Sequence, residues 1–489
     1  MASQEDIFKK VVSHCKEYGF IFQSSEIYDG LSAIYDYGQN GVELKNNIKN
    51  YWWKAMVQFN ENIVGIDSAI FMHPKIWKAS GHVDSFNDPM IDNKDSKKRY
   101  RADDLIENKI AQYENKGKTD KAKKLTDDLT KCLQESDLEG MYNLIVEHEI
   151  ACPFSGTRNW TKVRQFNLMF GTQMGSDVEE AETIYLRPET AQGIFVNFLN
   201  VQKTGRMKIP FGIAQIGKAF RNEIIARQFI FRMREFEQME MQFFVRPGEE
   251  MKWFEHWKNE RLKWHLAMGL GESKYRFHVH EKLAHYANAA EDIQFEFPFG
   301  FKEMEGIHSR TNFDLNQHQQ FSGKKLQYFD PELNQNYVPY VVETSVGLDR
   351  TFLAVMCASY KEEEIVNGDK TDVRVVLALP AFLAPVKVAI LPLMKKDGLP
   401  EKARQIMDSL KQEYSCAYDE KDAIGKRYRR NDAIGTPFCI TVDHQTLEDN
   451  TVTIRYRDSM QQERIPIDAI ENIVREKLKV GVKEVKLVV

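Results

Sequence analysis

Apolar and polar residues alternate along residues 211–245, and the alternation predicts two strands joined by a charged loop. Residues 211–220 are apolar enough for a buried strand, which ends at Arg221-Asn222-Glu223. From Arg234 onward the pattern has period two, which separates the two faces of the second strand. One face carries Met239, Met241 and Phe243, and the other carries Phe236, Gln238, Glu240 and Gln242. Acids and arginines beside one aromatic ring fit two interpretations equally: a crevice for a charged, planar ligand, or a solvated face at a sheet edge.

Helical spacing of apolar residues predicts two N-terminal helices, one from Asp6 to Tyr18 and one over residues 41–60. The apolar run at residues 63–74 is expected to be a strand that stops at Pro74, because proline cannot donate to a sheet ladder. Residues 183–200 predict a short strand, a turn and a helix whose start is marked by Pro188 and Thr190. Glu189 then lies near a helix N-terminus, where an acid complements the helix dipole even without a functional role.

The composition changes between residues 87 and 160. The stretch from Asp103 to Glu139 is rich in charged residues, and its leucines recur at helical spacing. It predicts two polar helices joined near Lys116-Gly117-Lys118, inserted into a larger domain. A solvated helical hairpin without chemistry is the favoured interpretation, and contact with an extended nucleic-acid partner is the alternative.

A β-branched strand at residues 338–345 runs into a glycine turn and a helix that begins at Leu348. Asp349 and Arg350 fall in the first turn of this helix. An arginine there opposes the helix dipole, and such a local conflict indicates a functional residue. Beyond the proline-punctuated link at 377–385, alternating strands and helices predict a small α/β domain. Its basic run GKRYRRND fits a solvated surface, or phosphate contacts if the protein acts on nucleic acid.

The composition sets limits on the function. A length of 489 residues predicts two or three domains, and a net charge of -5 provides no global basic field, so nucleic-acid binding would rest on local patches. The six cysteines form no CxxC pair, and the HxH at His278 and His280 has no supporting ligand pattern, so no metal site is predicted. Without an apolar leader or a membrane-length apolar run, the protein is expected in the cytoplasm and not in a membrane.

Three stretches in order carry a resemblance: the helix and strand up to Pro74, the hairpin around Arg221-Asn222-Glu223, and the strand–helix containing GLDR at 347–350. Their order resembles the three signature motifs of class II aminoacyl-tRNA synthetases. The segments RPETAQGIFVNF, QIGKAFRNEI, REFEQMEMQFF and VPYVVETSVGLDR are similar to those of glycyl-tRNA synthetases of the homodimeric type. The resemblance covers nearly the whole chain and is weakest in the insertion.

The resemblance implies an α+β fold: a six-stranded antiparallel catalytic sheet flanked by helices, a helical insertion and a C-terminal α/β anticodon-binding domain. The expected domains are 1–86 and 161–380 for the catalytic core, 87–160 for the inserted subdomain and 384–489 for the anticodon-binding domain. The implied activity is that of a glycine–tRNA ligase, which activates glycine with ATP and transfers it to tRNA(Gly). The expected partners are tRNA(Gly), glycine, ATP with Mg²⁺, and a second copy of the chain.

The resemblance also assigns site residues. Arg221 and Arg350 are the expected catalytic residues, at the α- and γ-phosphates of ATP, where a planar guanidinium suits phosphate. Phe236 is expected to stack on adenine, Glu223 to meet its amino group, and Glu303 could hold Mg²⁺. The full ATP-binding set is Arg221, Asn222, Glu223, Phe231, Arg232, Phe236, Glu303, Met304, Gly347 and Arg350. The glycine-binding set is Arg101, Glu189, Glu240, Arg310, Glu343 and Ser345, in which the acids would meet the ammonium group and Arg310 the carboxylate side.

Two positions depart from the family pattern. Some members carry paired cysteines in the insertion, whereas this chain has Cys152 without a partner, so no structural zinc is expected. Phe301-Lys302 stands where the family often has Trp-Gly, so the resemblance does not predict which side chains form this wall of the ATP pocket.

Two alternative functions make different demands on the sequence. Another class IIa synthetase, for threonine, proline or histidine, would want a larger pocket or zinc. A non-catalytic synthetase-like protein should have lost Arg221, Glu223, Phe236 and Arg350, all of which are present.

Overall fold

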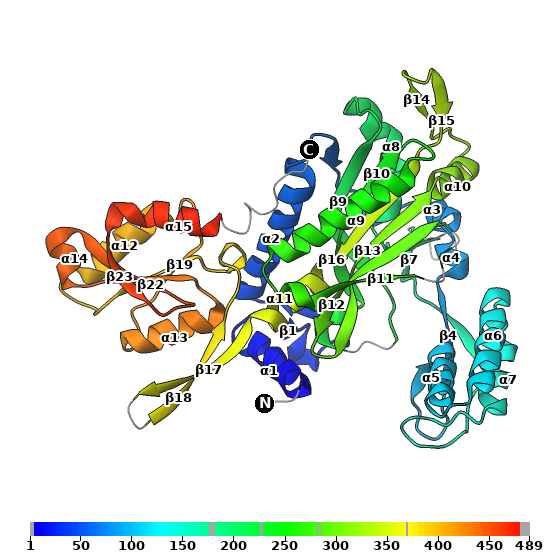
Figure 1. The fold of residues 1–489 in the computed structure, drawn as a ribbon, viewed down its shortest axis with the longest axis horizontal. Coiled ribbons are helices and arrows are strands. Elements are labelled where there is room, and N and C mark those ends of the chain that lie inside the picture. The colour runs from blue at the N-terminus through cyan, green and yellow to red at the C-terminus, as the bar shows by residue number, and fades with distance from the viewer. Residues whose placement is uncertain are drawn as a thin grey trace. The chain divides into compact units, whose positions relative to one another are not determined.

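The computed structural model describes residues 4–175, 181–224, 228–280, 283–284, 286–367 and 370–479. The chain divides into two compact units (Figure 1). The larger unit consists of Met1–Ile70, Glu189–Ala219 and Ala226–Val489. The smaller unit consists of Phe71–Pro188 and Phe220–Ile225. Within the described ranges, no helix is long and apolar enough to cross a membrane.

A mixed sheet of seven strands, counted over the described residues, forms the centre of the larger unit. Its order is β11 (Tyr275–Val279), β12 (Ala289–Phe297), β13 (Gly300–Thr311), β16 (Tyr340–Gly347), β10 (Glu235–Val245), β9 (Phe211–Phe220) and β3 (Ile63–Gly65). The pairs from β11 to β10 are antiparallel, and β3 runs parallel to β9. The expected six antiparallel strands therefore gain a seventh, parallel strand at one edge.

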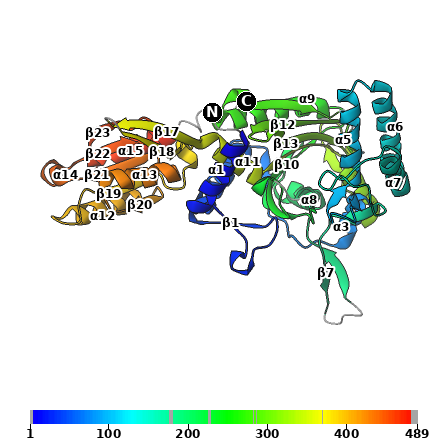
Figure 2. The same ribbon diagram turned by 90° about the horizontal axis from the view of Figure 1, so that it is seen from below.

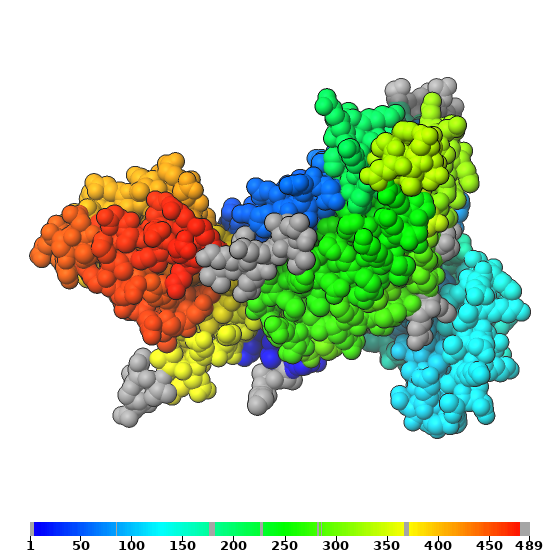
Figure 3. Space-filling model, turned by 45° about the horizontal axis from the view of Figure 1, so that its top comes forward, coloured from blue at the N-terminus to red at the C-terminus, as the bar shows by residue number. Residues whose placement is uncertain are grey.

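Helices cover both faces of this sheet. On one face, α2 (Gln39–Trp53), α9 (Glu250–Ala267) and α11 (Leu348–Ser359) bury Met239, Met241 and Phe243 of β10, as the sequence pattern predicted. Trp257 and Trp264 of α9 belong to the same core. In Figure 3, this part of the chain has the green colour of the central region. On the other face, α8 (Ala191–Thr204) and α10 (Phe313–Ser322) cover one end of the sheet, where Phe198 packs on Phe244 with ring centroids 4.6 Å apart.

Smaller elements complete the part of the larger unit that surrounds the central sheet. Helix α1 (Gln4–Glu17) leads into the strand pair β1 (Ile21–Gln23) and β2 (Tyr35–Tyr37), which enclose the short helix η1 (Glu26–Tyr28). A π-helical segment, η2 (Lys54–Gln58), extends α2, and η3 (Phe229–Phe231) precedes β10. The hairpin of β14 (Tyr328–Asp330) and β15 (Gln335–Tyr337) follows α10.

The C-terminal part of the larger unit is the predicted α/β arrangement. A hairpin of β17 (Tyr360–Asn367) and β18 (Lys370–Leu377) leads into it through η5 (Ala381–Leu383). Its five strands, in the order β20 (Cys416–Tyr418), β19 (Val388–Pro392), β21 (Phe438–Val442), β22 (Thr451–Tyr456) and β23 (Gln462–Pro466), bury their own apolar core. The accompanying helices are α12 (Leu399–Leu410), α13 (Ile424–Ile434), α14 (His444–Asp449) and α15 (Ile470–Leu478).

The smaller unit contains the predicted polar helices, α5 (Ala102–Asn115) and α6 (Thr119–Glu135), which meet at Lys116–Lys118 as expected. They lie beside α7 (Leu138–Glu147) in both Figure 1 and Figure 2. Leu105, Leu125 and Leu129 form part of their shared core. The unit also contains the three-stranded sheet of β5 (Arg99–Arg101), β4 (Asn87–Asp92) and β6 (Arg164–Asn167), and the hairpin of β7 (Gly171–Met174) and β8 (Glu182–Tyr185).

The expectation that Pro74 ends a strand was wrong. Strand β3 stops at Gly65, and Pro74 instead occupies the first turn of helix α3 (Pro74–Ala79), which precedes the short helix α4 (His82–Ser85). The His73 side chain caps α3 by accepting the Lys75 N–H at 3.1 Å. Proline suits this position because the first helical N–H groups have no partner within the helix.

Candidate active site

Two rows of residues, most of them polar, cross one face of the central sheet. Gln242 of β10 lies opposite Glu343 of β16, which lies opposite His308 of β13. In the next row on this face, Glu240 lies opposite Ser345, which lies opposite Gly306. The rows lie on one face because side chains of a strand alternate with period two. The pairing therefore brings together Glu240, Glu343 and Ser345, which the sequence assigned to one pocket from distant segments.

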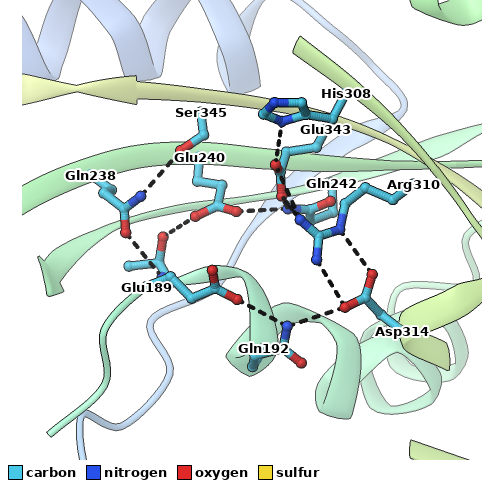
Figure 4. A network of polar contacts seen from close by, with 11 residues as sticks. Glu189, Gln192, Gln238, Glu240, Gln242, His308, Arg310, Asp314, Glu343 and Ser345 are labelled. Carbon is cyan, nitrogen blue, oxygen red and sulfur yellow. Dashed lines mark hydrogen bonds and ion pairs between the residues drawn. The ribbon is translucent and has the colours of Figure 1, made fainter. Parts of the chain in front are cut away.

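The amide of Gln242 joins the two buried acids. Its Nε2 donates to Glu240 Oε1 at 2.7 Å and to Glu343 Oε2 at 2.6 Å (Figure 4). The hydroxyl of Thr190 donates to the other oxygen of Glu240. Glu240 is 1% exposed and Glu343 5% exposed, so both carboxylates are oriented by the protein and removed from bulk water.

Arg310 is fixed by carboxylates of the protein. Its Nε and one terminal nitrogen donate to Asp314 at 2.8 and 2.9 Å, and the other terminal nitrogen lies 3.3 and 3.2 Å from the two oxygens of Glu343. The Tyr286 ring lies 4.0 Å from its guanidinium carbon. The sequence placed Arg310 on the carboxylate side of glycine. In this structure, Arg310 binds and orients Glu343, and its place on the carboxylate side of glycine stays a prediction.

The start of helix α8 supplies the third acid. Glu189 is half-buried and accepts from Gln192 Nε2 at 2.9 Å, and the same nitrogen lies 3.2 Å from Asp314. The backbone N–H of Thr190 donates to Gln238 at 3.2 Å, and Gln238 donates to Ser345 Oγ at 3.3 Å. These bonds connect the first turn of α8 to both strands of the pocket. Figure 4 shows the three acids together with their partners, which include His308 and Arg310 of β13 and Asp314 of α10.

The pocket holds its acids in different protonation states. Burial, followed by the charges of Glu343 and Glu189, raises the pKa of Glu240 well above its ordinary value. For Glu343, burial acts in the same direction but is overcome by Arg310 and His308, which lower its pKa. Arg310 and His308 thus favour the ionised form of Glu343, whereas burial and the two neighbouring acids favour the protonated form of Glu240.

Arg350 lies at the start of α11, as the sequence predicted. Its guanidinium carbon lies 4.5 Å from the centre of the Phe231 ring. One terminal nitrogen lies 3.1 Å from the backbone oxygen of Glu303 and 3.1 Å from its carboxylate. A Cβ at Gly347 would lie 3.3 Å from Arg350 Cδ, so glycine leaves room for this side chain. The half-exposed Glu303 side chain offsets the conflict between Arg350 and the helix dipole.

Three further predicted ATP-site residues lie on or beside the central sheet. Phe236 is half-buried on the same face of β10 as Gln238 and Glu240, and Arg232 is exposed just before this strand. Met304 is 1% exposed and belongs to the hydrophobic core. Its side chain is buried because the β-bulge in the pairing of β12 with β13 shifts the alternation between Glu303 and Glu305, and its contact with ATP stays a prediction.

The remaining predicted residues lie in the smaller unit. Arg221 Nε donates to the Pro188 carbonyl at 3.0 Å, and its guanidinium carbon lies 5.5 Å from the Phe86 ring. The backbone of Asn222 donates to Leu168 at 2.8 Å, and that of Glu223 donates to the Arg221 carbonyl at 2.7 Å. Backbone bonds thus hold the start of the loop that carries the predicted motif.

Arg101, also in the smaller unit, is bound by acids of the protein. Its guanidinium forms ion pairs with Asp88 at 2.8 Å and Asp103 at 2.6 Å, and a longer one with Asp104 at 3.6 Å. These contacts hold Arg101 at the start of α5, and its role in glycine binding stays a prediction.

Cys152 is surrounded by hydrogen-bond donors of the smaller unit. Its sulfur lies 3.3 Å from the Tyr100 hydroxyl, 3.4 Å from Ser96 Oγ and 3.5 Å from the Ser155 nitrogen. Although burial opposes ionisation, these hydrogen bonds lower the pKa of Cys152 to about 6. Over the ranges that the structure describes, no three His, Cys, Asp or Glu side chains are grouped so as to hold a metal ion.

Several residues of the site were not predicted. Gln238 and Gln242 were placed on the polar face of their strand without a role, and Thr190 was treated as a helix start. His308, Gln192 and Asp314 were not singled out. The alternation of His308 with Arg310 in EGIHSR is a signal that could have found His308. Gln192 and Asp314 meet only through the packing of α8 on α10, which the sequence does not show.

The largely antiparallel sheet and the α/β domain that follows it both match models of class II aminoacyl-tRNA synthetases. The family model described as "tRNA synthetase class II core domain (G, H, P, S and T)" matches residues 173–360. The model described as "Anticodon binding domain" matches residues 387–477. "Glycyl-tRNA synthetase insertion domain 1" matches 88–128 and 117–168. A prolyl-tRNA synthetase from Cryptosporidium parvum shares the fold, with a TM-score of 0.62 at 13% identity over 99% of this chain and 78% of that one.

Relatives over nearly the full length identify the family. The glycine–tRNA ligase of Chlorobaculum tepidum is 54% identical over 96% of this chain and 99% of its own. Those of Staphylococcus haemolyticus and Treponema denticola are 52% and 49% identical over 96% of this chain and 98% and 97% of their own. The chain belongs to the glycine–tRNA ligase family and is an ATP-dependent aminoacyl-tRNA ligase.

Proposed function

We propose that this enzyme activates glycine with ATP to glycyl-adenylate and pyrophosphate, and transfers glycine to the 3′ end of tRNA(Gly), with Glu189, Glu240 and Glu343 binding the glycine ammonium group. The observation that carries the pocket assignment is the Gln242 amide, which holds Glu240 and Glu343 together at 2.7 and 2.6 Å. An ammonium ion entering this pocket would find one ionised acid and a second that its own charge ionises.

The same arrangement suits the smallest amino acid. Glycine offers no side chain to grip, so its pocket must bind the ammonium group and exclude a β-carbon. Ser345 lies between Glu240 and Gly306 in one row, and Gln238 holds its hydroxyl. Because every competing amino acid is larger than glycine, steric exclusion by Ser345 and its neighbours can distinguish glycine from other amino acids without an editing site.

For ATP, we propose that Arg350 and Arg221 neutralise the phosphates, that Phe236 stacks on adenine and that Glu223 meets its amino group. Asn222, Phe231, Arg232, Glu303 and Gly347 complete the proposed set. The reaction joins the glycine carboxylate to the α-phosphorus and needs positioning and charge neutralisation rather than a covalent enzyme intermediate. Mg²⁺ arrives with ATP, and the half-exposed Glu303 carboxylate is of the kind it prefers.

Substitution of the acids tests the pocket. Glu240→Gln and Glu343→Gln should each raise the KM for glycine in ATP–pyrophosphate exchange far more than the KM for ATP. Gln is nearly isosteric with Glu, so the variants remove charge with little change in packing. Equal effects on both substrates would move these acids out of the glycine pocket. Exchange measured with each standard amino acid in turn would test the specificity.

Four further features are proposed from the resemblance. Residues 1–86 and 161–380 would form the catalytic core, 87–160 the inserted subdomain and 384–489 the part that binds the tRNA anticodon. The enzyme would work as a homodimer in the cytoplasm, which suits its six cysteines, none of which forms a disulfide. It would hold no structural zinc, since donors of the protein occupy the surroundings of Cys152. Sedimentation analysis and metal analysis of the purified enzyme test the dimer and the zinc.

A further inference from the structure

His308 binds the acid that the proposed pocket keeps ionised. It lies directly opposite Glu343 in the pairing of β13 with β16. Its Nδ1 donates to Glu343 Oε1 at 2.8 Å, while Gln242 donates to Oε2 at 2.6 Å. Arg310 contacts both oxygens. Glu343 thus faces one permanent cation, Arg310, and one side chain whose charge depends on pH.

The absence of a side chain at Gly306 leaves room for the imidazole of His308. A Cβ built at Gly306 would lie 2.7 Å from His308 Cε1, closer than real Cβ contacts allow. The ring therefore occupies space that any other residue at 306 would fill. Gly306 belongs to the row of Glu240 and Ser345, so the ring of His308 extends from its own row toward the second row of the pocket.

The surroundings of His308 favour its charged form. The charged groups that face it are Glu343 on β16, Arg310 on β13 and Asp292 on β12. The His280 ring lies 6.3 Å away and is itself bound to Asp292 at 2.8 Å. Burial opposes protonation, but the Glu343 carboxylate outweighs it and raises the pKa of His308 above its ordinary value.

We propose, building on the glycine pocket proposed above, that His308 is a positioning residue that holds the Glu343 carboxylate and weakens glycine binding whenever its imidazole is charged. An imidazolium and the glycine ammonium group compete for the same negative charge. When pH rises through the pKa of His308, the imidazole loses its charge but keeps the Nδ1–H that orients Glu343. The affinity for glycine should therefore rise with pH while the hydrogen bond persists.

Two variants separate the hydrogen bond from the charge. In His308→Asn, the side-chain amide can donate from the position of Nδ1 and carries no charge, whereas His308→Ala loses both. The KM for glycine is measured in pyrophosphate exchange between about pH 5 and about pH 8, the range in which histidine changes charge. Dividing the KM for glycine of the Asn variant by that of the wild type removes the pH dependence that Glu240 contributes to both enzymes. We expect this KM ratio to be about 0.1 at the acid end and to rise toward about 1 as pH passes the raised pKa of His308, for a coupling of about one pKa unit; the series is therefore extended to about pH 9.

The Ala variant should have a raised KM for glycine at every pH, because Glu343 loses a donor. The KM for ATP should show no corresponding change with pH in any variant. If the ratio of the KM for glycine in His308→Asn to that in the wild type is constant with pH, the role of the charge is overturned. If His308→Ala and His308→Asn have the same KM for glycine, the role of the hydrogen bond is overturned. If the His308 variants contradict the proposal, Glu343→Gln shows which proposal has failed. An unchanged KM for glycine in Glu343→Gln would mean that the pocket itself is wrong. A raised KM for glycine would mean that the pocket stands and only the role of His308 is wrong.

Discussion

The carboxylate of Asp349 accepts a hydrogen bond from the backbone N–H of Glu237 at 2.7 Å. This bond joins the first turn of α11, which carries Arg350, to strand β10 directly after Phe236. Asp349 is 3% exposed, and it also accepts from the Tyr37 hydroxyl. Lys45 of α2 binds Asp349 at 3.1 Å and Glu237 at 2.7 Å. Two residues proposed to bind ATP thus flank the ends of one buried ionic network.

Asp349→Asn should impair the use of ATP more than the binding of glycine. The amide preserves the shape of the side chain but removes the charge that Lys45 faces, so the start of α11 should be held less firmly. We expect a higher KM for ATP and a lower kcat in pyrophosphate exchange, with a loss of about 1–3 kcal/mol in the free energy of unfolding. Asp36→Asn, at an exposed position one residue from Tyr37, is the matched control. An equal effect on the KM for glycine would contradict a specific role for the network.

Arg221→Ala should reduce glycine-dependent exchange by about a hundredfold or more, the scale for losing one preorganised donor to a developing charge. Arg221→Lys should restore only part of the rate, since lysine keeps the charge but not the planar pair of donors. Thermal unfolding should change little, because Arg221 lies at the start of a loop, where its Nε donates to the Pro188 carbonyl. Arg158→Ala, at an exposed site of the smaller unit, serves as control. Near-normal exchange in Arg221→Ala would remove this residue from the catalytic set.

Glu240 should make the enzyme less stable as pH rises. Its pKa is raised in the folded state, so the folded protein holds a proton that the unfolded chain gives up near the ordinary carboxyl pKa. The stabilisation is complete below that ordinary value and is lost as pH rises through the raised pKa, by up to about 1.4 kcal/mol per pH unit. Glu240→Gln should flatten this part of the profile in denaturant unfolding, whereas Glu296→Gln, exposed on the same sheet, should not. Glycine should shift the wild-type profile by releasing the proton, and no shift would argue against ammonium binding at Glu240.

Asp432 should be essential for the C-terminal part and dispensable for adenylate formation. It accepts from Arg374 at 2.8 Å and from Arg455 at 2.8 and 3.0 Å, all with buried side chains. Asp432→Ala removes the acid shared by two buried arginines and leaves Arg455 without this ion pair, while Arg374 keeps Glu363 at 2.6 Å; the loss should cost about 3–5 kcal/mol. Charging of tRNA(Gly) should fall far more than pyrophosphate exchange. Asp408→Ala, a surface position paired with Lys411, should affect neither. Parallel losses of both activities would contradict separate roles.

The basic run GKRYRRND illustrates how far the sequence alone can mislead about charge. It was a candidate for phosphate contact, yet Arg427 is 1% exposed and donates to the carbonyls of Pro392 and Asp419 at 2.7 and 3.0 Å. Arg430 is paired with Asp419 and Asp422, and Arg429 with Asp372. The acids that bind these arginines lie as far as 57 residues away in the chain, so their pairing depends on the fold.

By itself, the sequence determined the faces of β10, the helix that carries Arg350, the insertion and the family. These features follow from short-range periodicity and from motifs whose residues are neighbours in the chain. It also placed Glu189, Glu240 and Glu343 together, but only through resemblance.

Only the tertiary structure decided what each charged group does. Arg310 and Arg101, which the resemblance assigned to glycine, bind acids of the protein, and only the fold shows these partners. Met304 lies in the core because a bulge shifts the alternation. The different protonation of Glu240 and Glu343 depends on which strand lies beside which, and on the cations that this pairing brings to one acid and not the other. Electrostatic interactions depend on distance and burial rather than on order along the chain, and both are set only when the sheet has formed.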